Sequence, residues 1–416
     1  MANLHTILKI HPISFIKGMS TALELTSKGI SKHHLETAII SYSIAQQLQL
    51  SQDSLQTLLY AALLHDIGAA SNWEEKHLIM HNDQQNSIFN HAESGYIILK
   101  DCRHLNVLSI PIRHHHDRFA GGNPSGLRGR DIPLLSRIIH IADRIDVMID
   151  TNDHIFNQRN KILDYISNSN IFDTELIQVV KYLAKTERFW LDIVNSSYQN
   201  KFLSDLNFLG KLMFDNEELF EIAEIFSRIV DKTSPYTASH SKNVAIVSSS
   251  LAKIYGYNDE EIKMFYLAGL LHDLGKLAVP NEILTRPGKL TEKEFDLVKQ
   301  HPYYSFRILE QIEGFGTIAT WVSQHHELLD ARGYPFGLEI DKISLGARII
   351  TVADTFCALS EDRPYRKGLS LDQTLQTMSN MALENKIDTK LVSYICSNAN
   401  MITNKITKNV IFPVEQ

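Results

Sequence analysis

An internal repeat is the feature that most constrains the fold of this chain. LLYAALLHDIG at 58–68 is similar to LAGLLHDLG at 267–275, and their His-Asp pairs are 207 residues apart. At the same offset HHLETAIISYSIA, from His33, aligns without a gap with HSKNVAIVSSSLA, from His240. Downstream, HAESGYIIL resembles HPYYSFRIL at an offset of 210, and SRIIHIAD resembles ARIITVAD at 211. So small a drift over the 110 positions from His33 to Asp143 indicates that a whole domain has been duplicated.

The repeated segments are predicted to be helical. LFEIAEIFSRIVDK, HSKNVAIVSSSLAKIY and DEEIKMFYLAGLLHDLG carry apolar residues at i, i+3, i+4 and i+7. Glycine and proline gather between such segments, as at Gly256, Pro280 and Gly314, and no run alternates as a strand would. We therefore predict an all-α protein of two tandem domains related by duplication, residues 1–211 and 212–416.

Composition narrows the class of function. The net charge of −7 and the pI of about 6.2 give no basic field for DNA or long RNA, whereas a small anionic substrate remains compatible. The three cysteines form no CxxC pair, which is typical of a reducing compartment. No apolar run reaches the roughly 18–20 residues that span a bilayer, so we expect a cytoplasmic protein without membrane contact.

Histidine and aspartate recur through the second domain in a pattern that suits metal binding. The candidate ligands are His240, His272, Asp273, His301, His325, His326 and Asp354. Imidazole and carboxylate bind borderline or hard divalent metals. A single zinc ion in a hydrolase needs three protein ligands, so seven candidates that share one carboxylate suit two ions about 3.5–4 Å apart.

Basic residues accompany these candidates. Lys276 follows Asp273 by three residues and would project from the same face of a helix, where it could stabilise a phosphate. Arg363 and Arg366 follow Asp354 and could hold a second phosphate or a base. A lone histidine on an apolar face is usually a core residue, and RPYRK alone would usually be a solvated loop. Seven ligand-type residues in a repeated order favour the metal site.

Residues 231–368, about a third of the chain, resemble the HD-GYP family, a branch of the HD phosphohydrolases. The family signatures are YTASHS (236–241), HDLGK (272–276), PGKLT and QHP (within 287–302), HHELLDARGYP (325–335), VAD (352–354) and DRPYRK (362–367). The resemblance implies two tandem HD-type helical domains, iron or manganese ions, and hydrolysis of cyclic di-GMP to linear pGpG and often to GMP.

The same resemblance assigns roles to individual residues. It implies that the seven candidates above are the metal ligands, with Asp273 bridging, and that Asp273 and Lys276 are catalytic. The implied substrate-binding residues are Lys276, Gly333, Tyr334, Pro335, Arg363 and Arg366.

Three positions depart from the family pattern. Tyr236 stands where some members have an acidic ligand for a third metal, which implies two ions here. Cys357 stands where a second aspartate usually follows Asp354, a change expected to weaken substrate placement. Ala331 replaces the glycine that usually follows the aspartate of the GYP motif, which is a mild change.

The N-terminal domain keeps the ligand types and loses the groups that would hold substrate. Ungapped matching gives a second candidate metal site of His33, His65, Asp66, His91, His114, His115 and Asp143. Ala69 stands in place of Lys276, Gly122-Asn123-Pro124 replaces GYP, and nothing like RPYRK follows. We favour a structural or regulatory domain, with or without metal, over a phosphohydrolase for another substrate or a second cyclic-dinucleotide phosphodiesterase.

The chain is thus predicted to be a phosphodiesterase that hydrolyses cyclic di-GMP with a metal-activated hydroxide. One alternative is another cyclic dinucleotide, such as 3',3'-cyclic GMP-AMP, because the motifs do not encode the base. A second alternative is a non-catalytic sensor that binds the nucleotide and signals through the N-terminal domain. A homodimer and protein partners in a signalling pathway remain open.

Overall fold

The computed structural model describes residues 10–26, 29–30, 32–69, 88–206, 213–233, 239–286, 288–362 and 367–408. The chain divides into two compact units between Phe214 and Asp215, which we call the N-terminal and C-terminal domains. The sequence placed this boundary after residue 211, and residues 207–212 lie outside the described parts.

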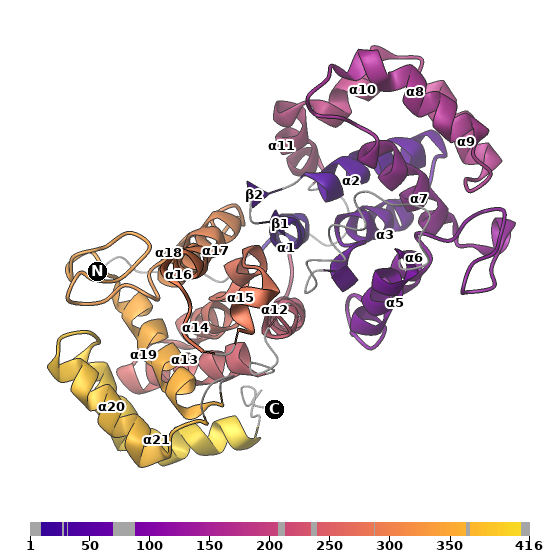
Figure 1. The fold of residues 1–416 in the computed structure, drawn as a ribbon. Helices are drawn as coiled ribbons and strands as arrows, with labels where there is room; N and C mark the ends of the chain where they lie inside the picture. The colour runs from indigo at the N-terminus through magenta and orange to yellow at the C-terminus, as the bar shows by residue number, and fades with distance from the viewer. Residues whose placement is uncertain are drawn as a thin grey trace. The chain divides into compact units, whose positions relative to one another are not determined.

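The described part of the N-terminal domain is helical apart from one antiparallel pair of two-residue strands, in which Leu25 pairs with Ile30 (Figure 1). In chain order its elements are α1 (Pro12–Leu23), β1 (Leu25–Thr26), β2 (Gly29–Ile30), α2 (His33–Gln47), α3 (Gln52–Leu63), η1 (Ile67–Ala69), α5 (Ile88–Leu99), α6 (Asn106–Arg113), η2 (Gly129–Asp131), α7 (Leu134–Val147), α8 (Ile155–Asn168), α9 (Thr174–Leu183), α10 (Glu187–Val194) and α11 (Ser196–Asp205).

The described part of the C-terminal domain contains helices and no strand. Its elements are α12 (Asn216–Asp231), α13 (His240–Tyr255), α14 (Asp259–Leu271), η3 (Leu274–Ala278), α15 (Asn281–Leu284), α16 (Glu292–Lys299), α17 (His301–Leu309), α18 (Gly316–Ser323), α19 (Leu345–Ser360), α20 (Leu371–Leu383) and α21 (Thr389–Lys408). The all-α prediction is confirmed. No helix in the described part of the chain is long and apolar enough to span a bilayer.

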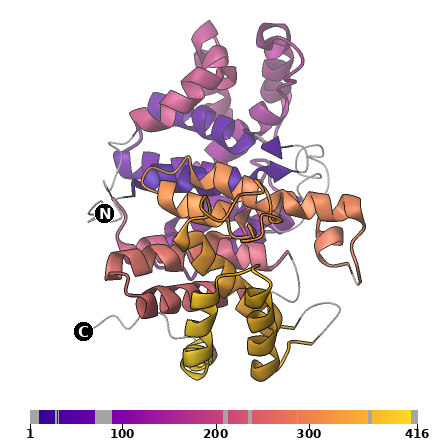
Figure 2. The same ribbon diagram turned by 90° about the vertical axis from the view of Figure 1, so that its left-hand side faces the viewer.

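The two domains share one packing scheme, as the sequence repeat requires. In the N-terminal domain α2 packs against α3 and α7, and in the C-terminal domain α13 packs against α14 and α19. The pairs α5–α6 and α17–α18 then pack beside the short helices η1 and η3. In the C-terminal domain α20 and α21 run side by side at the yellow end of the chain (Figure 1 and Figure 2). The shared scheme brings the repeated histidines to equivalent places.

Sequence signals at the helix ends explain where these helices begin and stop. Capping boxes start α12 (Asp215 with Glu218) and α14 (Asn258 with Glu261), in which side chain and backbone amide bond reciprocally. Gly256 ends α13 with φ of 105°, a left-handed conformation that favours glycine. Most residues of α13 between His240 and Ala252 are buried, so this helix forms the centre of the domain core.

Candidate metal centre

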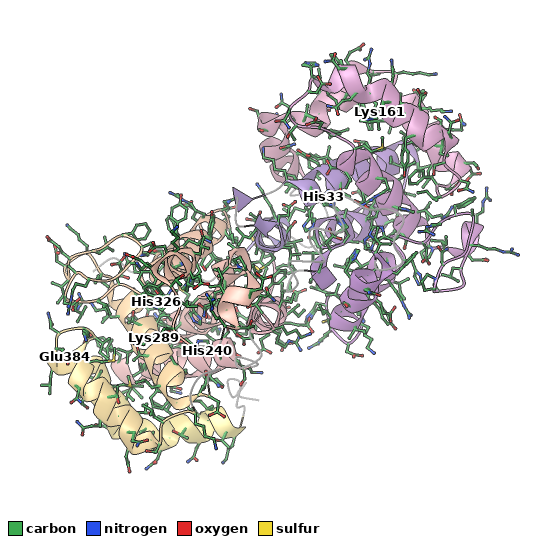
Figure 3. All side chains as sticks on the ribbon, in the orientation of Figure 1. His33, Lys161, His240, Lys289, His326 and Glu384 are labelled. Carbon is green, nitrogen blue, oxygen red and sulfur yellow. The ribbon has the colours of Figure 1, made fainter. Side chains whose placement is uncertain are left out.

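Separate elements of the C-terminal domain bring the candidate ligands together. His240 is the first residue of α13, and His301 is the first residue of α17. His272 and Asp273 lie between α14 and η3, the His325-His326 pair follows α18, and Asp354 lies on α19. Figure 3 shows His240 and His326 among the helices of this domain and His33 in the N-terminal domain. Helix ends, rather than one helix face, therefore supply most of the site.

A glycine after the His-Asp pair permits this convergence. A Cβ atom on Gly275 would lie 2.1 Å from the carbonyl oxygen of His301. The Gly275 amide also donates to Ser305 Oγ at 2.8 Å, and that hydroxyl donates to the His272 carbonyl at 2.9 Å. The N-terminus of α17 can thus approach Asp273 closely only because residue 275 has no side chain. Gly68 has the same place in the N-terminal domain, where a Cβ atom on it would lie 2.0 Å from the carbonyl oxygen of His91.

Two carboxylates connect the histidines. Asp273 Oδ2 lies 3.3 Å from His272 Nε2 and Oδ1 lies 3.2 Å from His301 Nε2, so its two oxygens face different imidazoles. Asp354 Oδ1 lies 3.2 Å from His240 Nε2 and 3.9 Å from His272 Nε2. His240, His272 and Asp273 form one group that could hold an ion, and His301, His325 and His326 form another. Asp273 belongs to the first group and its Oδ1 atom faces His301 of the second, as a bridging ligand would.

Backbone carbonyls orient three of the imidazoles. The Nδ1 atoms of His272, His301 and His325 lie 2.8, 2.7 and 2.5 Å from the carbonyl oxygens of Gly269, Val298 and Val322 respectively. A carbonyl oxygen can only accept, so each Nδ1 carries the hydrogen and each neutral ring presents the Nε2 lone pair to the centre. His301 Nε2 and His325 Nε2 are 3.3 Å apart. Two lone pairs at that distance repel each other unless a cation lies between them.

The charges of the cluster, and its buried polar atoms without hydrogen-bond partners, also suit a divalent cation. Burial alone would lower the pKa of His240, but hydrogen bonds to Asp354 and Glu361 outweigh it and raise the pKa to about 10. Burial would raise the pKa of Asp273, yet His272 and Lys276 hold it well below its usual range. Within the described residues, the buried atoms His272 Nε2 and Asp273 Oδ1 have no hydrogen-bond partner. The carboxylates around His240 thus favour a positive charge at this position, and a divalent ion bound there would take the place of the His240 proton.

The residues predicted to contact substrate border this cluster. Lys276, in η3, places its ammonium nitrogen 2.5 Å from Asp273 Oδ2. The helix α14 ends before His272, so the contact with Lys276 forms across a 3-10 turn and not along the α-helix that we predicted. The Tyr334 ring packs on His326 with centroids 4.8 Å apart. Tyr236, Arg363 and Arg366 lie outside the described residues.

Glu327 holds the Gly333-Tyr334-Pro335 loop, a role that the sequence interpretation missed. Its buried carboxylate accepts hydrogen bonds from the amides of Phe336 at 2.7 Å and Leu338 at 2.9 Å. The Tyr334 amide donates to the carbonyl of His326 at 3.2 Å. A Cβ on Gly333 would lie 2.4 Å from the Cα of Glu327, so the loop folds directly onto the histidine pair.

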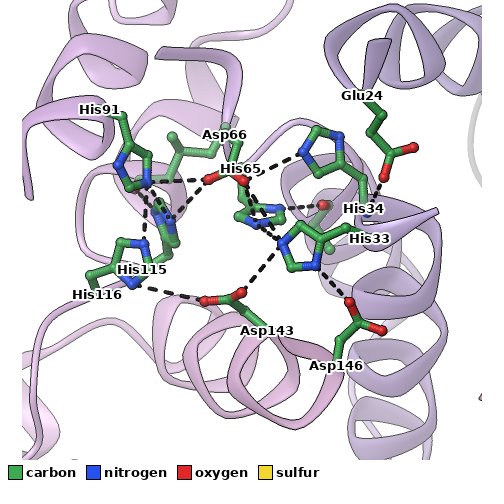
Figure 4. Close-up of polar contacts among 12 residues, drawn as sticks. Glu24, His33, His34, His65, Asp66, His91, His115, His116, Asp143 and Asp146 are labelled. Atoms are coloured by element: carbon green, nitrogen blue, oxygen red, sulfur yellow. Dashed lines mark hydrogen bonds and ion pairs between the residues drawn. The ribbon is translucent and has the colours of Figure 1, made fainter. Parts of the chain in front are cut away.

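The N-terminal domain contains a second cluster, in which every member of the possible ion-binding groups is buried (Figure 4). Asp66 Oδ2 lies 3.3 Å from His65 Nε2 and Oδ1 lies 3.2 Å from His91 Nε2, which repeats the arrangement around Asp273. His33 Nε2 lies 3.3 Å from Asp143 Oδ1. The groups here that could hold an ion are Asp66, His91, His115 and His116; His33, His65 and Asp143; and His34, His65 and Asp66.

The structure corrects one register in the sequence alignment. His115 Nδ1 lies 2.6 Å from Ile112 O, and His115 Nε2 lies 3.2 Å from His91 Nε2. His325 makes the same two kinds of contact, with Val322 O and with His301 Nε2. The His115–His116 ring pair has a centroid distance of 4.0 Å, close to the 4.1 Å of His325–His326. His115 and His116 therefore correspond to the second pair, and the matching of His114 was wrong. His114 Nδ1 instead bonds to Asp117 at 2.8 Å.

The N-terminal cluster differs from the C-terminal one in its charges. Ala69 is buried where Lys276 stands in the other domain, so no ammonium group can come from that position. Arg144 binds Asp143 through Nε and Nη2 at 3.0 and 3.1 Å, which partly neutralises that carboxylate. His34 adds an imidazole 3.5 Å from Asp66 Oδ2, where the C-terminal domain has Ser241. No sequence motif had marked His34.

Family models for the HD domain match residues 30–148 and 224–391. A 3'3'-cGAMP-specific phosphodiesterase of Vibrio cholerae is 30% identical over 391 residues, which are 91% of this chain and 90% of that protein. The crystal structure of a cyclic GMP-AMP specific phosphodiesterase of the same species superimposes with a TM-score of 0.66 at 28% identity and covers 93% of this chain and 97% of that one. A cyclic di-GMP phosphodiesterase of Pseudomonas aeruginosa is 43% identical over 150 residues, or 36% of each chain.

Proposed function

The chain belongs to the HD-GYP family of cyclic-dinucleotide phosphodiesterases, and from this premise we propose that it hydrolyses 3',3'-cyclic GMP-AMP. The observation that supports this substrate is the extent of the similarity. The likeness to the cyclic GMP-AMP enzymes runs through both domains, whereas the likeness to the cyclic di-GMP enzyme covers 36% of the chain. Cyclic di-GMP, which we predicted from sequence, is the second candidate because that shorter match has the higher identity, 43%.

We assign the reaction to the C-terminal domain, residues 212–416. His240, His272, Asp273, His301, His325, His326 and Asp354 would hold two divalent ions, iron or manganese. When bound, such ions lower the pKa of a coordinated water toward neutrality and so supply the nucleophile. The resulting hydrolysis gives a linear dinucleotide, which further hydrolysis converts to mononucleotides.

The remaining residues of the site bind and orient the nucleotide. Lys276 supplies a positive charge for the phosphoryl oxygens, because its ammonium lies beside the carboxylate assigned as the bridge. Tyr334 packs on His326 and with Gly333 and Pro335 forms a wall beside the cluster, which Glu327 holds in place. Arg363 and Arg366 are assigned to the phosphates or bases of the dinucleotide.

We assign a structural or regulatory role to the N-terminal domain, residues 1–211. Its imidazoles can hold a cation, but Ala69 provides no charge for a phosphate and Arg144 competes for Asp143. Metal binding without dinucleotide hydrolysis is the behaviour that this combination favours.

The test compares the two dinucleotides with one preparation of the full chain, purified without oxygen and loaded with Mn²⁺. We expect kcat/KM for 3',3'-cyclic GMP-AMP to exceed that for cyclic di-GMP by at least ~10-fold, which corresponds to about 1.4 kcal/mol of transition-state binding. Faster turnover of cyclic di-GMP would transfer the proposal to the second candidate. Tight binding of either nucleotide without hydrolysis would instead indicate a sensor.

A further inference from the structure

The two domains orient the first histidine of the cluster with carboxylates from different positions. In the N-terminal domain His33 Nδ1 lies 2.6 Å from Asp146 Oδ2 (Figure 4). Asp146 lies on α7, three residues after the candidate ligand Asp143, so one helix supplies both carboxylates. This contact presents the Nε2 atom of His33 to the cluster.

The C-terminal domain lacks a carboxylate at the equivalent position. Three residues after Asp354 stands Cys357, a buried thiol. His240 Nδ1 nevertheless has a carboxylate partner, Glu361 Oε2, at 2.8 Å. Glu361 follows α19 directly and lies four residues, about one helical turn, after Cys357, so it emerges on the same side of the helix. Its longer side chain covers the remaining distance.

The second oxygen of the Glu361 carboxylate is also held, by a residue of α13. Asn243 Nδ2 donates to Glu361 Oε1 at 2.7 Å, and Asn243 lies one turn after His240 on α13. Glu36 is the aligned residue of the N-terminal domain, and burial together with the charge of Asp146 raises its pKa to about 9. The C-terminal domain thus contains a chain of donor, carboxylate and imidazole, whereas the second oxygen of Asp146, Oδ1, has no hydrogen-bond partner among the described residues.

We infer that Glu361 is the positioning residue of the C-terminal centre, in place of the carboxylate that Cys357 cannot provide. The Nδ1 atoms of His272, His301 and His325 donate to backbone carbonyls. The Nδ1 atom of His240, the first residue of α13, instead bonds to the Glu361 carboxylate. A carboxylate partner fixes the ring and its tautomer and makes Nε2 a more basic ligand. The inference rests on the proposed function only in taking His240 as a metal ligand.

The experiment measures the dissociation constant of Mn²⁺ for the full-length protein, by competition with a chelating indicator. We expect Glu361→Gln to weaken binding at the C-terminal centre by ~10–100-fold, the usual effect of removing such a partner. The double variant Cys357→Asp/Glu361→Gln should regain most of the affinity, because it places a carboxylate where Asp146 stands in the other domain. Glu310→Gln is the matched control, since Glu310 also follows a helix directly and pairs only locally with Arg307, at 2.7 Å.

Wild-type Mn²⁺ affinity in Glu361→Gln would overturn the inference, as would a loss that Cys357→Asp fails to restore in a folded double variant. If the single variant does not fold, recovery of folding and affinity in the double variant supports the inference. Mn²⁺ affinity does not depend on which nucleotide is cleaved. A wild-type protein that hydrolyses neither dinucleotide would therefore refute the proposed function and leave the result for Glu361 intact.

Discussion

Lys276→Met tests the charge that distinguishes the two domains. Lys276 lies 2.5 Å from Asp273 Oδ2, and its side chain is 21% exposed, so the ammonium is fixed beside the cluster. Methionine keeps the approximate length of the side chain and removes the charge. At an effective dielectric constant of about 20, a unit charge roughly 4 Å from a phosphoryl oxygen contributes about 4 kcal/mol. Part of this acts on the ground state, so we expect kcat to fall by about 10²–10³.

The assay combines steady-state hydrolysis with metal analysis on the same sample. Metal content should stay at the wild-type level, because Lys276→Met removes no ligand. Lys263→Met is the control: Lys263 also pairs with an acid three residues earlier, at 2.6 Å, and its side chain is 25% exposed. A tenfold change in kcat corresponds to about 1.4 kcal/mol of activation free energy. If kcat of Lys276→Met stays within about threefold of the wild-type value, the role of the charge is refuted. Loss of metal with the loss of activity would show that Lys276 acts through Asp273 instead.

Three further predictions concern the ligands and their support. Asp273→Ala should lose both C-terminal ions and hydrolysis, measured by elemental analysis and product chromatography; two retained ions with normal turnover would contradict the bridging assignment. His65→Ala/Asp66→Ala should keep hydrolysis and His272→Ala/Asp273→Ala should lose it, and the reverse result would place catalysis in the N-terminal domain. Gly275→Ala should lower the free energy of unfolding by about 1–3 kcal/mol, because its Cβ would lie 2.1 Å from His301 O, while Gly316→Ala, with open space at its Cβ, should leave thermal unfolding unchanged.

The helices and the order of the candidate ligands could be predicted because both depend on local or repeated patterns. Apolar spacing and capping residues such as Asp215 and Asn258 act within a few positions. The repeat relates His240 to His33 without any knowledge of the fold. The all-α architecture was predicted from these patterns, and membership of the HD-GYP family from the resemblance of motifs such as HDLGK and HHELLDARGYP; both predictions are confirmed.

Features that depend on tertiary contact could not be predicted in this way. Three consecutive histidines at 114–116 allow two alignments of equal quality, and only their partners, such as Ile112 O for His115, distinguish them. Glu361 is far from His240 in sequence, and no spacing rule connects a residue after one helix with the first residue of another. Glu327 was missed for the same reason, since its partners are backbone amides of a folded loop.

Burial of the ligands has a consequence for the kinetics of metal exchange. In the N-terminal cluster every candidate ligand is buried, and His65 and His115 have no exposed surface, whereas His326 and Asp354 of the C-terminal cluster are partly exposed. An ion in the N-terminal cluster can therefore leave or enter only when the surrounding helices open locally, an event slower than diffusion of the ion. We expect chelators to remove metal from that cluster at the rate of this opening, and mild denaturant to accelerate the removal. The metal found in the N-terminal domain of the purified protein would then reflect the ions present when the chain folded.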